Sequence, residues 1–165
     1  MILVAGIGNI FLGDDGFGSE VARRMSERVL GPAVRVIDFG IRGVDFLYAL
    51  LDGYEATIII DTLSRGGTPG TIYIVDPDVH ELTATAAAVE PHAMDPFRTL
   101  ALARSMGAIL SNVRIVGCEP ATFGHPDEGQ MGLSPCVAAT VDDAIRLVEG
   151  LVGDTFQNFF CQEAL

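Results

Sequence analysis

Acidic side chains follow two of the apolar runs that the sequence predicts to be buried strands. Asp14 and Asp15 come after the run 2–7, and Asp61 closes the run 56–60. Ligands of open α/β sheets bind where the carboxyl ends of parallel strands meet, so we expect Asp15 and Asp61 to share one edge. Carboxylate oxygens suit a divalent cation, and an imidazole nitrogen would complete a set typical of a first-row metal.

Three histidines could supply that nitrogen. His92 lies just ahead of a predicted helix that Asp95 caps, in a segment that must return to the carboxyl edge of the sheet. His125 lies in a long loop and is a second candidate, whereas the polar surroundings of His80 predict a surface position. The ligands are scattered through the chain, so spacing alone does not choose between them.

Each acid also has a purely structural interpretation. Asp14 or Asp15 can cap the helix that follows, and Asp61 can cap the turn after its strand. Asp38 ends a predicted strand and can bond nearby backbone N–H groups.

A nucleotide-binding loop is the main alternative at the first strand. Gly6 and Gly8 begin the pattern G-x-G-x-x-G, and Asp38 could contact a ribose, but Phe11 occupies the third glycine position. Two adjacent carboxylates also stand where the pyrophosphate would bind. Unit charges about 4 Å apart repel by roughly 4 kcal/mol at an effective dielectric constant of about 20. The pattern therefore argues against a dinucleotide, and we expect Phe11 and Phe17 to pack rather than to recognise a ligand.

Strands and helices alternate along the chain. We predict strands at 2–7, 33–38, 56–60, 71–75 and 113–117, and helices at about 16–29, 44–51, 96–106 and 135–149. Only nine residues separate Asp61 from the strand 71–75, and a parallel crossover needs about a dozen or more. That strand should therefore run antiparallel, at or near a sheet edge. The predicted fold class is α/β: a three-layer sandwich with a five-stranded, mostly parallel twisted sheet, one antiparallel strand and helices on both faces.

The length of 165 residues is typical of one domain. We predict a single α/β domain over residues 1–153 and a C-terminal tail over 154–165. Ser134 should cap the last helix, which we expect to end near Glu149 because Gly150 and Gly153 follow.

Composition excludes several functional classes. The net charge of −12 leaves no basic patch for nucleic acid or an anionic membrane. The three cysteines form no C-x-x-C pair, and Cys118 is expected to be a small buried apolar residue. No basic region precedes the first apolar run, and no run is as long as a membrane span. We expect a cytoplasmic protein.

Motifs along most of the chain resemble those of the hydrogenase maturation proteases. These endopeptidases trim the C-terminal extension from the large subunit of nickel–iron hydrogenases. The matching segments are GIGNIFLGDDGFG (6–18), DFGIRG (38–43), IIID (58–61), PGT (69–71), PH (91–92), GCEP (117–120) and GLSP (132–135).

The resemblance implies a site and a substrate. The metal-binding acid of the family falls on Asp15, and its other ligands fall on Asp61 and His92. These three side chains would contact the nickel of the substrate, and a divalent metal could occupy the same ligands in the isolated protein. Cleavage would follow by metal polarisation of the scissile carbonyl or a water, or with Asp15 or Asp38 as general base.

The implied partner is the large-subunit precursor, bound by a monomer. Two other functions stay open from the sequence. One is a non-catalytic metallochaperone or docking module for the precursor, and the other is a nucleotide-binding α/β domain.

Overall fold

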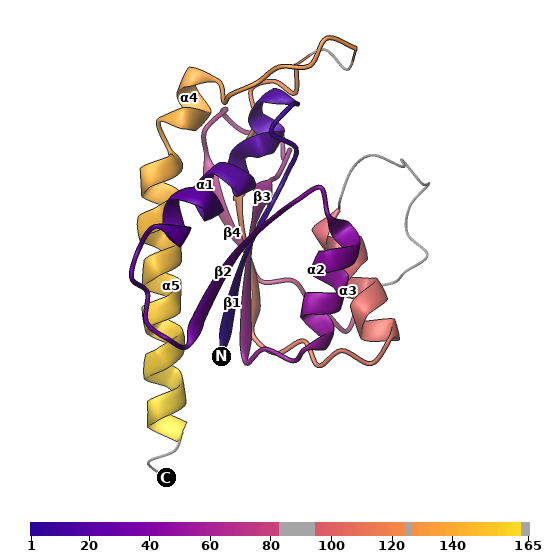
Figure 1. Cartoon of the computed structure of the whole chain (residues 1–165), viewed down its shortest axis with the longest axis vertical. Coiled ribbons are helices and arrows are strands. Elements are labelled where there is room, and N and C mark those ends of the chain that lie inside the picture. Colours follow the sequence, from indigo (N-terminus) through magenta and orange to yellow (C-terminus); the bar gives the residue numbers. More distant parts are fainter. Residues whose placement is uncertain (83–94, 125–126, 163–165) are drawn as a thin grey trace.

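The computed structural model describes residues 1–82, 95–124 and 127–162, with side chains up to residue 157 (Figure 1). Its strands are β1 (Ile2–Ile7), β2 (Val34–Gly40), β3 (Ala56–Thr62), β4 (Ile72–Val75) and β5 (Val113–Cys118). Its helices are the 3₁₀ turn η1 (Gly13–Gly16), α1 (Phe17–Ser26), α2 (Gly43–Leu51), α3 (Pro96–Ser105), α4 (Pro135–Ala138) and α5 (Val141–Gln162).

The strands form one sheet in the order β2-β1-β3-β5-β4. All neighbouring pairs are parallel except β4 and β5, so β4 is an antiparallel edge strand as predicted. After β1 the chain moves to β2 on one side, and after β2 it crosses to β3 on the other side. This change of direction creates a topological switch point between the carboxyl ends of β1 and β3, where ligands of such sheets bind.

Helices cover both faces of the sheet (Figure 1), which confirms the three-layer prediction. On one face, Ile2 and Val4 of β1 pack under α1, α4 and α5. On the other face, Leu3, Ala5 and Ile7 pack under α2 and α3. This alternation explains why β1 reads as a continuous apolar run, because a strand between two helical layers is buried on both sides. Among the described helices, none is long and apolar enough to cross a membrane.

Helix α1 lies unusually close to the sheet, and glycine makes this possible. A Cβ atom on Gly18 would lie 2.1 Å from the carbonyl oxygen of Ile60 and 2.2 Å from that of Ile7. A Cβ on Gly6 would lie 2.4 Å from the Cβ of Ala22. The first turn of α1 is therefore held directly against the carboxyl ends of β1 and β3.

The prediction for the last helix is wrong. Helix α4 is a short turn, and α5 runs without interruption through Gly150 and Gly153 to Gln162, past the predicted domain end at residue 153. Leu151, Val152 and Phe156 pack on the α1 face, so burial outweighs the low helix propensity of glycine.

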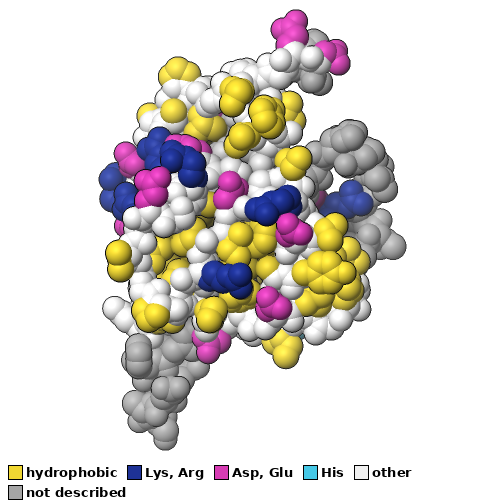
Figure 2. Space-filling view, viewed as in Figure 1, with side chains coloured by type: hydrophobic (Ala, Val, Ile, Leu, Met, Phe, Trp, Pro, Cys, Tyr) yellow, Lys and Arg dark blue, Asp and Glu magenta, His cyan; other side chains and the backbone are white. Residues whose placement is uncertain are grey.

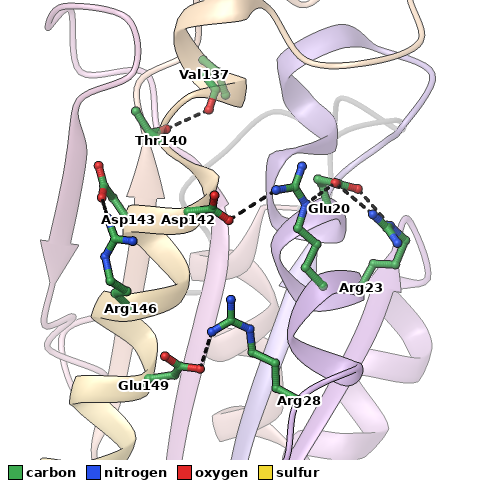
Figure 3. A network of polar contacts seen from close by, with 10 residues as sticks. Glu20, Arg23, Arg28, Val137, Thr140, Asp142, Asp143, Arg146 and Glu149 are labelled. Carbon is green, nitrogen blue, oxygen red and sulfur yellow. Dashed lines mark hydrogen bonds and ion pairs between the residues drawn. The ribbon is translucent and has the colours of Figure 1, made fainter.

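Ion pairs join α5 to α1 and to the residues just after α1 (Figure 3). Arg28 pairs with Glu149 at 2.8 Å, and Arg24 pairs with Asp142 at 3.4 Å. The side chains of these pairs are partly solvent-exposed, so they contribute little to stability compared with the apolar contacts beneath them.

Two glycine-to-alanine substitutions should have opposite effects on stability. Gly18→Ala places a methyl group against two backbone carbonyls, so we expect it to lower the free energy of unfolding by about 3 kcal/mol or more. Gly150→Ala fills open space on an exposed helical position, so we expect it to raise that free energy by about 0.5–1 kcal/mol. Urea denaturation of both variants checks the pair. A destabilised Gly150→Ala would contradict the continuous α5.

Candidate functional site

A cavity of about 230 Å³ lies at the switch point between β1 and β3. The loop after β1, the end of β3, the loop after β2 and the beginning of α3 form its walls. Three carboxylates line it, those of Asp15, Asp61 and Asp95. No arginine or lysine is found among the described residues that line it.

Asp15 is held in the cavity wall by the loop after β1. Its Oδ2 accepts the backbone N–H of Asn9 at 2.8 Å, and its Oδ1 lies 3.5 Å from the hydroxyl of Thr62. Gly8 allows this geometry, because its φ is +142° and a Cβ there would lie 1.8 Å from the carbonyl oxygen of Asp15. Burial raises the pKa of the Asp15 carboxyl, although the bonds from Asn9 and Thr62 oppose that shift.

Asp61 occupies the end of β3 and is only 6% exposed. It follows Ile59 by two residues, so both face the side of the sheet that α2 and α3 cover. Its Oδ1 accepts the N–H of Thr62 at 2.7 Å. Burial and the negative charges of Asp15 and Asp95 raise the pKa of Asp61 well above its ordinary value. Both effects favour a protonated acid or a bound cation at this position.

Asp95 is a third acid at the cavity, and the sequence identified it only as a helix cap. That role is confirmed, since its Oδ1 accepts the N–H of Phe97 at 2.9 Å at the beginning of α3. The same cap places the carboxylate beside Asp61. Asp95 follows His92 by three residues, and this proximity in the sequence could have indicated that Asp95 belongs to the site.

Asp14 faces the opposite way from Asp15, and the prediction that either caps α1 is wrong. The residue preceding α1 is Gly16, with no side-chain cap. Asp14 is fully buried and accepts the N–H groups of Ala121, Thr122 and Ser134 at 2.6–3.1 Å, and the Ser134 hydroxyl at 2.9 Å. Burial alone would raise the pKa of Asp14, but these bonds outweigh it and lower the pKa. Ser134 therefore donates its hydroxyl to Asp14 instead of capping α4.

Glu119 is a second buried anchor, and sequence reasoning did not single it out. Its carboxylate accepts the N–H of Arg65 at 2.8 Å, the N–H of Gly66 at 3.1 Å and the hydroxyl of Tyr73 at 2.9 Å. It thereby fixes the loop after β3, whose first residues, Leu63 among them, line the cavity. Burial acts to raise the pKa of Glu119, but the hydrogen bonds prevail and lower it.

The other predicted residues lie apart from this cavity or outside the described residues. Asp38 is exposed and does not line the cavity. Its carboxylate accepts the N–H of Gly40 at 3.0 Å, as expected if Asp38 has only a structural role. His80 is exposed, as predicted. His92 and His125 lie outside the described residues.

The described part of the chain supplies oxygen ligands for a cation but not a complete metal site. Asp15 and Asp61 line one cavity, and their carboxylates suit a divalent ion. Across residues 1–82, 95–124 and 127–162, no three His, Cys, Asp or Glu side chains are grouped to hold a metal.

Comparisons with known proteins identify the family. The profile described as "Hydrogenase maturation protease" matches residues 19–151, which is most of the chain. The chain belongs to the hydrogenase maturation protease family. It is a hydrogenase maturation endopeptidase, as the sequence motifs predicted.

Individual relatives of the protease agree with this assignment. It is 34% identical to a putative hydrogenase maturation protease of Methanocaldococcus jannaschii, over 90% of this chain and 94% of the relative. It is 35% identical to the hydrogenase expression/formation protein HupD of Rhodobacter capsulatus, over 87% and 67% of the two chains. The structure of the hydrogenase maturating endopeptidase HybD from E. coli matches with a TM-score of 0.76 at 28% identity, over 93% of each chain.

Asp14 and Asp15 of the protease should respond oppositely to substitution. Asp14→Ala leaves four partly buried donors without an acceptor, so we expect the free energy of unfolding to fall by about 2–4 kcal/mol. Asp15→Asn keeps an oxygen for the N–H of Asn9 and removes a charge beside Asp61, so the free energy should stay constant or rise. Chemical denaturation at pH 7 measures both. An equal loss of unfolding free energy in both variants would contradict the assignment of Asp14 as a structural anchor and Asp15 as a site residue.

Glu119 should make stability depend on acid pH. Because its folded pKa lies below its usual value near 4.5, its contribution is present above pH 4.5 and is lost as the pH falls through the folded pKa. Glu119→Gln should therefore lower the melting temperature most above pH 5, and the gap to the parent protein should narrow on acidification. Calorimetry between pH 3 and 7, at about half-unit steps, measures the difference in melting temperature between the two proteins. A gap that widens toward pH 3 would show that Glu119 is not held as an anion.

Proposed function

We propose that the protease removes the C-terminal extension of the large-subunit precursor of a nickel–iron hydrogenase after nickel insertion. In this proposal Asp15, Asp61 and His92 contact the nickel of the precursor, so the metal is part of the substrate. Processing takes place in the cytoplasm on a monomeric enzyme.

One observation carries the proposal: the carboxylates of Asp15 and Asp61 line the same cavity, and burial raises the pKa of both. A cavity that gathers acids without a facing lysine or arginine among its described lining favours a cation from outside. Asp95, which lines the cavity, follows His92 by three residues, which supports His92 as the third ligand. Two carboxylate oxygens and one imidazole nitrogen can complete the coordination sphere of a metal that arrives with unfilled coordination positions.

The residues at the cavity can also serve the hydrolysis. Bound nickel would supply Lewis-acid polarisation of the scissile carbonyl or of a water. Asp15 can orient a water and accept its proton, because its carboxylate is fixed by the N–H of Asn9. Asp61, more deeply buried, would hold the cation.

Asp38 is the second candidate for the general base. Its place on β2, outside the cavity lining, favours Asp15 for this role. The loop that follows Asp38 does reach the cavity through Gly40 and Ile41. A role for Asp38 would therefore be contact with the substrate segment beside the cavity.

Nickel should determine whether the precursor is cut. Purified protease incubated with nickel-loaded precursor should release one C-terminal peptide, detectable by mass spectrometry, and nickel-free precursor should stay intact. Asp15→Asn and His92→Ala should reduce the rate at least about a hundredfold, since the first removes the negative charge and the proton acceptor and the second removes a nitrogen ligand. His80→Ala is the matched control and should cut normally, because His80 is exposed.

The same assay separates the alternatives. Equal cutting of both precursors would contradict nickel recognition, and binding without any cut would favour a docking module. Asp38→Asn should raise KM more than it lowers kcat if Asp38 contacts the substrate. A loss confined to kcat, as large as that of Asp15→Asn, would instead make Asp38 the base.

A further inference from the structure

Exposed apolar side chains gather on the loops beside the cavity. Ile10 is 47% exposed, Phe11 57%, Phe123 44% and Met131 74%, and we call these four side chains the apolar crest. The exposure of Phe11 corrects the prediction that it packs inside the protein. Figure 2 shows apolar side chains clustered at the end of the molecule where these loops lie. Single exposed apolar residues are common, whereas a cluster marks an interaction surface.

Backbone contacts fix the loops of the crest to one another. The N–H of Gln130 donates to the carbonyl of Phe11 at 2.8 Å, and the N–H of Gly13 donates to the carbonyl of Gln130 at 2.7 Å. The N–H of Asp14 donates to the carbonyl of Thr122 at 3.0 Å. Together with the buried Asp14 carboxylate, these bonds make the crest a preformed surface, which reduces the entropy lost on binding.

The crest extends into an apolar groove of about 420 Å³ against α1 and α4. Ile10, Met131 and Leu133 form its walls. Its charged lining residues are already paired, since Glu20 bonds both Arg23 and Arg24 (Figure 3). The groove therefore suits an apolar occupant rather than an anion.

The crest and the cavity share one loop. Asn9 lines the cavity and donates its N–H to Asp15, and the next two residues, Ile10 and Phe11, belong to the crest. A protein whose peptide bond lies in the cavity must also cover the surface beside it. The acidic, exposed Glu128 stands in the same loop as Met131, so the edge of the crest complements a basic flank.

We propose that the apolar crest docks the hydrogenase precursor through an apolar segment flanked by basic residues, apart from the segment that is cut. This inference rests on the proposed function. The crest supplies binding energy that is the same before and during the cleavage step, so it acts on KM and not on kcat.

A double substitution tests the crest with the full-length protease. Phe11→Ser with Met131→Ser should raise KM for the nickel-loaded precursor roughly ten- to a hundredfold and leave kcat unchanged. The matched control is Val29→Ser with Ile109→Ser. These residues are 100% and 75% exposed and precede β2 and β5, at the opposite edge of the sheet, so KM should not change. Circular dichroism and the melting temperature verify that both variants fold.

Direct binding separates this inference from the proposed function. Calorimetric titration of precursor into the Asp15→Asn protease measures docking without turnover, and the crest substitutions should weaken that binding by the same factor. If the parent protein does not cut the precursor, the proposed function fails. The titration still shows whether the crest binds the precursor.

Three outcomes would overturn the crest proposal. They are an unchanged KM and binding constant in the double variant, a loss confined to kcat, or a crest-dependent self-association in sedimentation velocity that would make a second copy the occupant. Glu128→Gln should weaken binding about two- to threefold at low salt, with the difference vanishing at high salt. A constant difference across salt concentrations would exclude the basic flank.

Discussion

The buried carboxylate of Asp14 is the interaction on which the site depends. Four hydrogen bonds join it to the segments 121–122 and 134, more than a hundred residues away in sequence. They tie the loop after β1 to the loop after β5 and to the beginning of α4. An anion buried without a cation is stable only when donors surround it, and here backbone N–H groups and one hydroxyl do so. Because Asp14 is fixed inward, its neighbour Asp15 is directed toward the cavity.

Close backbone packing completes the positioning of Asp15. Gly18 lets the first turn of α1 touch the carbonyls at the ends of β1 and β3, and Gly8 lets the loop fold back on Asp15. The two strands that carry the site are thus joined both by their ladder and by the helix above them. Glu119 fixes the loop that follows β3 in a similar way. The cavity is therefore bordered by segments whose backbones have little freedom, which favours precise placement of a metal or a peptide.

Much of the fold and part of the site could be predicted from the sequence, for identifiable reasons. The apolar runs and the short link before β4 determined the sheet, and Asp15 and Asp61 could be placed because strand ends meet at a switch point. Asp14 and Glu119 could not be assigned as anchors, because their donors are distant in sequence. The end of α5 was missed because tertiary packing overrides glycine propensity.

The arrangement of acids in the cavity is unfavourable for the free protein and informative about its task. Burial and like charges raise the pKa of Asp61 well above its ordinary value, which favours a proton or a cation at this carboxyl. In the proposed function, a cation that enters with the substrate would take the place of that proton and bind the carboxylates of Asp15 and Asp61. The apolar crest lies beside the cavity and, as proposed, would offer the same contact to either form of the precursor. Discrimination would thus reside in the cavity and general affinity in the crest. Separating the two would let the enzyme hold its substrate while the metal determines whether the complex is productive.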